Sequence, residues 1–319
     1  MLPTRRPLIV RLRNWVGDVV LGIPTLERLA GAGYSLQLVG RGWARDLLAG
    51  YGWPVQPLPP KMGQRIQQLR ALRHAAVRDD TGFARRINSL CLPDSFGSAL
   101  EFRLAGLRAL GHAYEGRSLL LGRAMPRSEH QHMLRVYWQL GDALLGSAAE
   151  PPPDIGMRLA GEHRMQAQAL RQQHGLADGY VVICPFAGGT WNKQPKTWPA
   201  FSTFAATELP RFKRQLVICP GPGEEEMART QFPGATLLPA VGLGAYAALL
   251  QGAALMISND TGPGHLAAAV GAPLLSVLGP TEPEQWGAWG HSVRVVRQWP
   301  GWPDMRSVAD AVAQMLTRQ

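Results

Sequence analysis

The sequence predicts an α/β fold made of two doubly wound, Rossmann-like domains, each with a parallel sheet. Three observations lead to this class. Short apolar segments alternate with amphipathic ones along the chain, as strands and helices do in such folds. The 319 residues are enough for two domains that each bury a core. Three consecutive prolines in the run 150–154 interrupt the alternation near its midpoint, where they stop a helix and favour an extended linker.

The prolines set the predicted boundary, with an N-terminal domain over 1–152 and a C-terminal domain over 153–319. The two domains are expected to face each other across a central cleft, because ligands bind beyond the carboxyl ends of parallel strands. The last helix of the chain is a candidate for packing back on the N-terminal domain.

The N-terminal domain opens with a strand over 8–12, which is mostly apolar and therefore expected to be central in the sheet. A loop follows, and Asp18 opens an amphipathic helix that ends near Gly31 and Gly33. Beyond it, strands are predicted over 35–39, 55–58 and 87–92, and helices over 43–48, over 64–75, from a cap at Asp94 or Ser95 to 107, and over 129–145.

The same alternation resumes after the prolines. Strands are predicted over 180–185, 215–219, near 236–238, from Leu255, and over 274–278, and helices over 162–174, from Trp198, from Glu224, over 245–252 and after Asp260.

The composition is that of an ordinary soluble globular protein, with 46% hydrophobic and 18% charged residues. The longest apolar run, 241–257, contains glycines and Gln251, so it reads as a core helix and strand rather than a membrane span. Cys91, Cys184 and Cys219 have no paired spacing and are expected to be buried, reduced thiols of a cytosolic protein, neither metal ligands nor a disulfide. The net charge of +10 predicts an acidic partner, such as a phosphorylated lipid, a membrane surface, a nucleotide or a nucleic acid.

The clearest candidate site follows the strand that begins at Leu255. Thr261, Gly262 and Gly264 are expected in the first turn of a helix, where unpaired N–H groups and the helix dipole attract an anion. Asp260 could accept hydrogen bonds from sugar hydroxyls beside that anion. The stretch therefore predicts a receptor for a sugar joined to a phosphate. The alternative is an ordinary Asp or Thr helix cap, with His265 on the helix and its hydrogen bonds satisfied.

Asp18 is the second candidate. It follows Gly17 at the start of a helix, where its carboxylate could take a proton from an attacking hydroxyl. The alternative is a favourable charge in the first turn of the helix. The three spaced glycines of a dinucleotide fingerprint do not follow the first strand, which argues against a dehydrogenase.

Two further loops follow strands of the C-terminal domain. The loop 186–199 offers Lys193 and Lys196 to a diphosphate, but it lacks the ending of a Walker loop. In the loop 220–226, Glu224 is placed to hold ribose hydroxyls, whereas the two glutamates after it are read as ordinary first-turn acids.

These residues together resemble a known family. Residues 8–26, the Lys-Thr-Trp-Pro segment at 196–199, Gly-Glu-Glu-Glu at 223–226, Asp-Thr-Gly-Pro-Gly-His at 260–265 and Gly-Pro-Thr at 279–281 are similar to the lipopolysaccharide heptosyltransferases of glycosyltransferase family 9. The segments 15–18 and 92–100 resemble heptosyltransferase II more than heptosyltransferase I, although the loop 188–195 departs from the type II pattern. The resemblance implies the two-domain GT-B fold and transfer of heptose from ADP-L-glycero-D-manno-heptose to the inner core on lipid A, with inversion.

On the donor side, the resemblance implies a role for each motif residue. Lys196 matches the lysine that neutralises the leaving diphosphate, and Glu224 matches the acid that contacts the ribose. Asp260 matches the carboxylate on the heptose hydroxyls. Thr261 and Gly262 match the phosphate seat, with His265 close by. No Asp-x-Asp motif is present, so no cofactor and no obligatory metal are expected.

On the acceptor side, Asp18 matches the general base. Lys61, Arg65, Arg70 and Arg73 lie along one predicted helix and could face the phosphates of a lipid A–core acceptor, or form a solvated face. The same charges would favour peripheral attachment to the inner face of the cytoplasmic membrane.

Three other functions remain open. A basic protein could bind nucleic acid, but the basic region shows neither stacking aromatic residues nor a recognised motif. A nucleotide-sugar epimerase shares the architecture and the donor motif. A family 9 transferase could also use another sugar donor.

Overall fold

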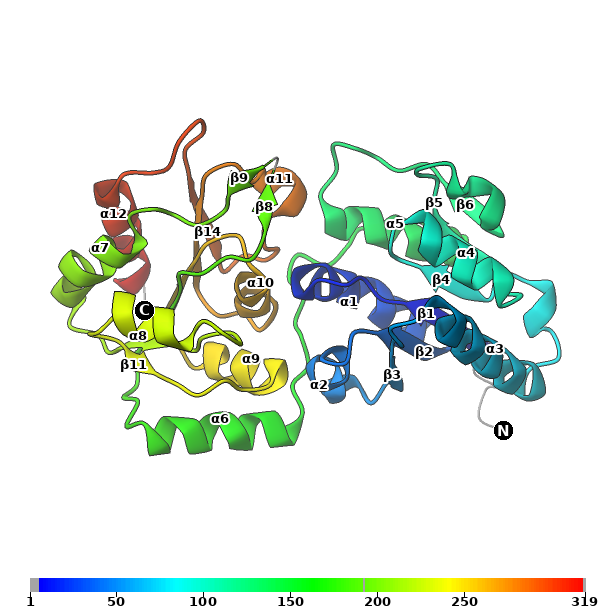
Figure 1. Cartoon of the computed structure of the whole chain (residues 1–319), viewed down its shortest axis with the longest axis horizontal. Helices are drawn as coiled ribbons and strands as arrows, with labels where there is room; N and C mark the ends of the chain where they lie inside the picture. The colour runs from blue at the N-terminus through cyan, green and yellow to red at the C-terminus, as the bar shows by residue number, and fades with distance from the viewer. Residues whose placement is uncertain (1–5, 192, 318–319) are drawn as a thin grey trace. The chain divides into compact units, whose positions relative to one another are not determined.

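The computed structural model describes residues 6–191 and 193–317, so Asn192 of the predicted loop 186–199 lies outside the described residues. The chain divides into two compact units, one ending at Pro152 and the other beginning at Pro153 (Figure 1). Each unit contains one six-stranded sheet in which all neighbouring strands are parallel. The predicted α/β class of both halves is confirmed.

The sheet of the first unit has the order β3-β2-β1-β4-β5-β6. This is the doubly wound order, in which the chain reverses direction across the sheet beside its first strand. The strands are β1 (Arg6–Arg11), β2 (Tyr34–Gly40), β3 (Val55–Pro57), β4 (Ser89–Cys91), β5 (Ala109–His112) and β6 (Arg123–Met125).

The sheet of the second unit repeats that order as β11-β10-β7-β12-β13-β14. A separate antiparallel pair, β8 (Thr190–Trp191) and β9 (Gln194–Pro195), forms a hairpin after β7. The six parallel strands are β7 (Val181–Cys184), β10 (Leu216–Ile218), β11 (Thr236–Leu237), β12 (Leu255–Ser258), β13 (Leu274–Leu278) and β14 (Val293–Arg297).

Helices connect the strands in both units. The first unit has α1 (Val16–Gly31), α2 (Ala44–Leu47), α3 (Met62–Asp79), α4 (Phe96–Leu104) and α5 (Met133–Leu145), with short 3₁₀ turns η1 (Ala49–Tyr51), η2 (Phe83–Arg85) and η3 (Arg117–Leu120). The second unit has α6 (Gly161–Gln173), α7 (Phe201–Thr207), α8 (Glu225–Gln231), α9 (Leu243–Gln251), α10 (Gly262–Ala269), α11 (Pro283–Trp286) and α12 (Met305–Leu316), with η4 (Leu209–Phe212).

Several predicted boundaries need correction. Helix α1 begins at Val16, so Asp18 lies within its first turn and does not open it. Of the two predicted caps of α4, Ser95 is the one used, since its side chain accepts a hydrogen bond from the Ser98 N–H. Helix α5 starts at Met133 and not at 129, because the His132 ring caps it by accepting from the Leu134 N–H.

The central strands carry the cores, as their apolar sequences predict. Leu8, Ile9 and Val10 of β1 are fully buried, and so are the apolar residues of β12. The last helix, α12, contributes Val308, Ala311 and Val312 to the core of the second unit. Helix α12 therefore buries its apolar stripe within the unit that contains it.

None of the described helices combines the length and apolar character needed to cross a membrane. The three cysteines are free thiols. Cys91 is buried, as predicted, whereas Cys184 and Cys219 are only partly buried. Burial raises the pKa of Cys184 to about 11, so this thiol stays protonated at neutral pH.

Candidate functional site

The carboxyl edge of the first sheet gathers charged side chains around Asp18. Asp18 lies in the first turn of α1, and its side chain is only 11% exposed. The Tyr137 hydroxyl, from α5, donates a hydrogen bond to Asp18 Oδ1 over 2.8 Å. Arg13, from the loop after β1, places its Nε 3.7 Å from the same oxygen. Neither partner was predicted from the sequence.

Asp94 joins Arg13 to a second arginine. Its Oδ2 lies 2.9 Å from Arg13 Nη1 and 3.1 Å from Arg127 Nη1. Burial disfavours the charged form of Arg13, but the carboxylates of Asp18 and Asp94 outweigh burial and raise its pKa. Arg13 is therefore a permanent cation between two carboxylates, and it ties the loops after β1 and β4 together.

His112, at the end of β5, approaches the other oxygen of Asp94 at 4.0 Å. Its ring is almost fully buried, and this burial lowers its pKa to about 4. His112 is therefore neutral at physiological pH. The positive charge beside Asp18 and Asp94 comes from the arginines.

The basic helix α3 is divided between two edges of the first unit. Lys61, its N-cap, and Arg65 lie where the chain enters from β3, at the carboxyl edge. Arg70 and Arg73 lie roughly 13 to 18 Å beyond Lys61 along the helix axis, at about 1.5 Å per residue. Their guanidinium groups donate to the Leu104 and Gly106 carbonyls at the end of α4. These two arginines join α3 to α4, so the structure does not bring them to the group around Asp18.

Arg65 has structural partners as well. It donates to the Pro59 and Pro60 carbonyls and forms a 3.0 Å ion pair with the buried Glu101. It thus fixes the loop between β3 and α3 beside the carboxyl edge.

In the second unit, Asp260 is the centre of a compact polar cluster. Lys196 Nζ lies 3.0 Å from Asp260 Oδ2, and the Thr281 hydroxyl donates to the same oxygen over 3.0 Å. His265 Nε2 lies 3.9 Å from Oδ1. Burial disfavours ionisation of Asp260, but His265 and Lys196 outweigh it and lower the pKa to about 2. Residues 64 positions apart in the sequence thus form one ionised pair.

Helix α10 begins directly after Asp260, as predicted. Thr261 is its N-cap, and the threonine hydroxyl accepts a hydrogen bond from the Gly264 N–H over 3.4 Å. The Gly264 N–H, which was predicted to be free for an anion, is therefore already paired. The alternative prediction, a threonine cap, is therefore confirmed for the Gly264 N–H. The Gly262 N–H belongs to the first residue of the helix and is not the group that this cap binds.

His265 is 7% exposed, and its Nδ1 is buried with no hydrogen-bond partner among the residues that the structure describes. A small hollow borders this ring together with Asp260, Thr261 and Gly264. Because buried polar atoms usually have a partner, the open nitrogen beside a hollow marks a place for a polar ligand group.

Buried Asn259 holds the loops around this cluster. Its Oδ1 accepts from the Trp198 N–H over 2.9 Å, and its Nδ2 donates to the Pro185 carbonyl over 2.6 Å. Trp198 is 1% exposed. Asn259 thereby fixes both ends of the segment that presents Lys196.

Glu224 is the N-cap residue of α8, and its Oε2 accepts a hydrogen bond from the Gly221 N–H over 2.8 Å. Helix α8 therefore begins one residue later than predicted. The carboxylate lies at the carboxyl edge of the second sheet, after β10, and closes the glycine-rich turn. The next two glutamates lie in the first turn of the helix, as predicted.

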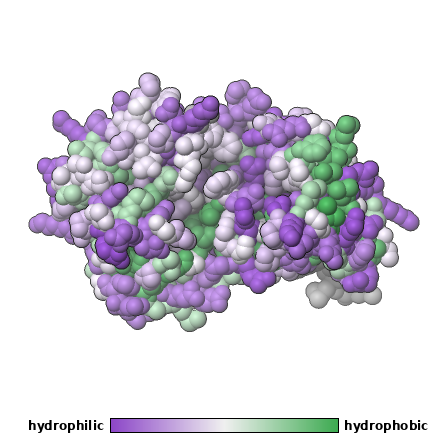
Figure 2. All heavy atoms as spheres, in the orientation of Figure 1, coloured by the Kyte–Doolittle hydropathy of each residue, from purple (hydrophilic) through white to green (hydrophobic). Residues whose placement is uncertain are grey.

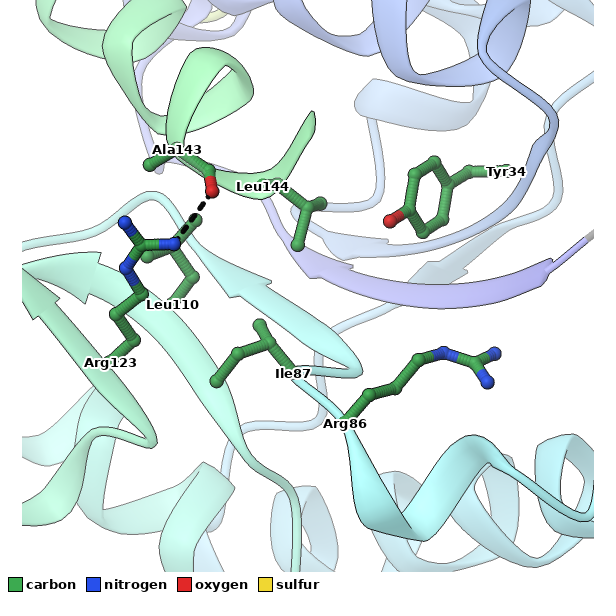
Figure 3. A pocket seen from close by; sticks show the side chains of 7 residues that line it. All are labelled: Tyr34, Arg86, Ile87, Leu110, Arg123, Ala143 and Leu144. Carbon is green, nitrogen blue, oxygen red and sulfur yellow. Dashed lines mark hydrogen bonds between the residues drawn. The ribbon is translucent and has the colours of Figure 1, made fainter. Parts of the chain in front are cut away.

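Another hollow lies in the first unit, away from both clusters. It has a volume of about 190 Å³ and is lined by Tyr34, Ile87 and Arg123, each at or just before the start of a strand of the first sheet (Figure 3). Arg123 donates to the Ala143 carbonyl on its wall. This is the amino edge of the sheet, opposite to Asp18, so the hollow is not part of the candidate site.

Sequence reasoning missed seven residues that the structure places in the two clusters. Arg13, Asp94 and Thr281 lie in loops that follow predicted strands, so the rule that located Asp18 and Asp260 could have found them. His112 ends β5 and Arg127 follows β6, two strands that the sequence did not predict. Tyr137 lies inside a helix and Asn259 ends a buried run, and no local signal distinguishes either.

Comparison with known proteins gives consistent matches. The model of "Glycosyltransferase family 9 (heptosyltransferase)" matches residues 88–311. Lipopolysaccharide heptosyltransferase 1 of Pseudomonas aeruginosa PAO1 is 48% identical over 58 residues, 18% of this chain and 16% of that protein. Lipopolysaccharide heptosyltransferase 2 of Escherichia coli K12 is 23% identical over 316 residues, 92% of this chain and 88% of that protein. The chain covers 16%, 30% and 38% of the lengths of the first three curated relatives that it matches.

Among solved structures, ADP-heptose lps heptosyltransferase II of E. coli has a TM-score of 0.79 and 20% identity, covering 98% of this chain and 99% of that chain. At this identity the likeness concerns the fold. The predicted fold class, GT-B, is confirmed.

Proposed function

The chain belongs to glycosyltransferase family 9, whose model matches more than half of its residues, and from this premise we propose that it is an inverting heptosyltransferase. The proposed donor is ADP-L-glycero-D-manno-heptose, and the proposed acceptor is the inner core of lipopolysaccharide. Relatives named as lipopolysaccharide heptosyltransferases support heptose as the transferred sugar and lipopolysaccharide as the class of acceptor.

The cluster around Asp260 is the observation that carries the proposal. It combines a cation, an ionised carboxylate and the start of a helix within one loop group. We assign Lys196 to the diphosphate and Asp260 to the heptose hydroxyls. The Lys196 ammonium has three hydrogens, so it can contact Asp260 and a phosphate oxygen together. Thr261 and Gly262 would seat a phosphate at the positive end of α10. The open Nδ1 of His265 would face the same ligand.

Glu224 is assigned to the ribose. One of its oxygens already holds the Gly221 N–H, and a carboxylate can accept several hydrogen bonds. This leaves acceptor capacity for a vicinal diol at the carboxyl edge of the sheet, where nucleotides bind in doubly wound folds.

In the proposed reaction, Asp18 takes the proton of the acceptor hydroxyl while the oxygen of that hydroxyl bonds to the anomeric carbon of the donor sugar. The bond from that carbon to the diphosphate breaks on the opposite face, and its electron pair leaves with ADP. Lys196 and the start of α10 stabilise the charge on the departing diphosphate. We assign acceptor phosphates to Lys61 and Arg65, which lie at the same edge as Asp18. Arg70 and Arg73 keep the structural contacts described above.

The test is a transfer assay with the purified chain, ADP-heptose and a heptose-free lipid A–core acceptor, read by mass spectrometry. We expect the acceptor to gain one heptosyl unit, with release of ADP and inversion at the anomeric carbon. EDTA should leave the rate unchanged, because no step is assigned to a metal. ADP-glucose and ADP-mannose replace the donor in parallel reactions; efficient transfer of either sugar, without heptose transfer, would refute the heptose assignment.

Incubation with ADP-heptose alone separates transfer from the epimerase alternative. A transferase needs only one base facing the acceptor, whereas an epimerase needs further acid and base groups around the bound sugar. We expect the donor to be recovered with its configuration unchanged. Isomerised sugar in the absence of acceptor would favour the epimerase.

We also propose that the first unit attaches to an anionic membrane surface. Residues 1–152 contain 20 Lys and Arg against 11 Asp and Glu, whereas residues 153–319 contain 13 against 12. Figure 2 shows an apolar patch over the neighbouring elements α4 and η3. Phe96, Leu104 and Leu119 are exposed there, and Leu119 is 92% exposed. Apolar side chains beside arginines suit the interface of a charged bilayer.

Sedimentation with lipid vesicles tests this attachment. The protein should bind vesicles that contain phosphatidylglycerol, and salt should weaken the binding because it screens the charges. Leu119→Asp should reduce the affinity about tenfold, since burying a leucine contributes about 1.5 to 3 kcal/mol. The matched control is Met165→Asp, which changes an exposed apolar residue of the second unit. Equal losses for the two variants would contradict the assigned surface.

A further inference from the structure

Asp18 has two oxygens in unequal surroundings. Oδ1 accepts the hydrogen bond from Tyr137 and faces Arg13, as described above. Among the residues that the structure describes, no donor contacts Oδ2. The two oxygens of one carboxylate are therefore distinguished by the protein.

The surroundings of Tyr137 keep its hydroxyl group as a hydrogen-bond donor to Asp18. Its side chain is fully buried where α5 packs against α1. Burial first, and the charge of Asp18 second, raise its pKa well above the usual value, so the phenol keeps its proton. A phenol that keeps its proton at neutral pH remains a hydrogen-bond donor to Oδ1.

Arg13 is fixed from the far side. Its Nη1 is held by Asp94 at 2.9 Å, and Asp94 also pairs with Arg127. The guanidinium can therefore keep Nε towards Asp18 without a large loss of side-chain entropy. Together the two groups stabilise the ionised carboxylate and restrict its rotation.

From this geometry we propose that Tyr137 and Arg13 are positioning residues. They occupy Oδ1 of Asp18 and leave Oδ2 as the atom that receives the acceptor's proton. In that step the O–H bond of the acceptor breaks, the new O–H bond forms on Oδ2, and the freed electron pair forms the glycosidic bond. The inference rests on the proposed function, because it refines the action of the proposed base.

The discriminating variant is Tyr137→Phe, which removes one hydroxyl and keeps the ring. Loss of a hydrogen bond to the charged form raises the pKa of a carboxyl group. We expect the acidic limb of the profile of kcat/KM against pH to move up by about one unit. We also expect kcat to fall about tenfold at neutral pH, because the freed carboxylate can rotate.

Tyr180→Phe is the matched control. Tyr180 is also fully buried, and its hydroxyl donates to the Leu249 carbonyl in the second unit. Both variants lose a buried hydrogen bond and should lower the melting temperature by similar amounts. Only Tyr137→Phe should move the acidic limb. A lowered melting temperature with an unmoved limb would show that the Tyr137 hydroxyl is merely structural and would overturn the inference.

A second measurement does not depend on turnover. In the whole protein labelled with carbon-13 at the aspartate carboxyl groups, the Asp18 resonance is identified by its absence in Asp18→Asn. The pKa of the Asp18 carboxyl group should rise in Tyr137→Phe and also in Arg13→Gln. The arginine variant removes the other partner of Oδ1 and gives an independent result if the tyrosine variant does not fold. A raised pKa without any sugar transfer would uphold the positioning and reject the proposed function. An unchanged pKa in both variants would reject the positioning itself.

Discussion

Replacing Asp18 with asparagine should lower the rate of heptose transfer by roughly 10²- to 10⁴-fold, the usual contribution of a general base. The amide cannot take a proton, but its oxygen can still accept the hydrogen bond from Tyr137, so the local structure should persist. Donor binding should stay within about twofold of the original, because the base acts on the acceptor and the loss falls on the transition state. Single-turnover kinetics and calorimetry with ADP measure the two effects.

The matched control for Asp18 is Asp46→Asn. Asp46 also lies in the first turn of a helix of the first unit. If Asp18 were only a favourable charge at a helix start, both variants would lose a few tenths to about 1 kcal/mol of stability and keep their activity. Turnover that survives in Asp18→Asn would thus remove the assigned role.

Replacing Lys196 with alanine should weaken ADP binding about 10- to 100-fold. A hydrogen bond to a charged group contributes about 1.5 to 3 kcal/mol, and each 1.4 kcal/mol corresponds to a factor of ten in affinity. The variant also leaves Asp260 without its cation, and the uncompensated carboxylate would repel the diphosphate further. Isothermal titration of ADP reports the change directly.

Two controls separate these contributions. Lys193→Ala removes an equal charge from the same loop and should leave the affinity for ADP nearly unchanged. Asp260→Asn should also spare ADP, which lacks the heptose, but it should weaken binding of ADP-heptose. Unaltered ADP affinity in Lys196→Ala, or an equal loss in Lys193→Ala, would show that Lys196 points away from the diphosphate.

The strands that carry strong apolar patterns could be predicted from sequence. Strands β1, β12 and β13 lie where their buried, β-branched or leucine-rich runs predict, because both faces of a central parallel strand need apolar side chains. Strand β5 was missed since its sequence, Ala-Leu-Gly-His, lacks β-branched residues. Strand β6, three residues at the sheet edge, is too short to show a period.

The candidate site could be predicted only in part, for a related reason. Asp18 lies in the first turn of the helix that follows β1, and Asp260 lies just after β12. The topology of a parallel sheet brings such positions to the carboxyl edge of each sheet. The contacts that set their chemistry come from distant segments. Tyr137 lies 119 positions from Asp18, and Lys196 lies 64 positions from Asp260. These pairs depend on helix packing and loop paths, which no local pattern encodes. Arg70 and Arg73 are the opposite case. The sequence shows them clearly as part of a charged stripe on α3, but their contacts are with the carbonyls at the end of α4 and not with the group around Asp18.

The boundary at Pro152 and Pro153 has a consequence for evolution and engineering. Every strand of each sheet comes from one uninterrupted stretch of chain, and α12 packs into the core of the second half, to which it belongs. A crossover at the prolines would therefore leave both sheets intact and keep α12 with the core that it packs against. On the proposed assignment of donor and acceptor binding to the two halves, recombination there would join a new nucleotide-binding half to an existing acceptor-binding half in a single event. Hybrid genes joined at this codon pair offer a route to transferases with altered sugar choice.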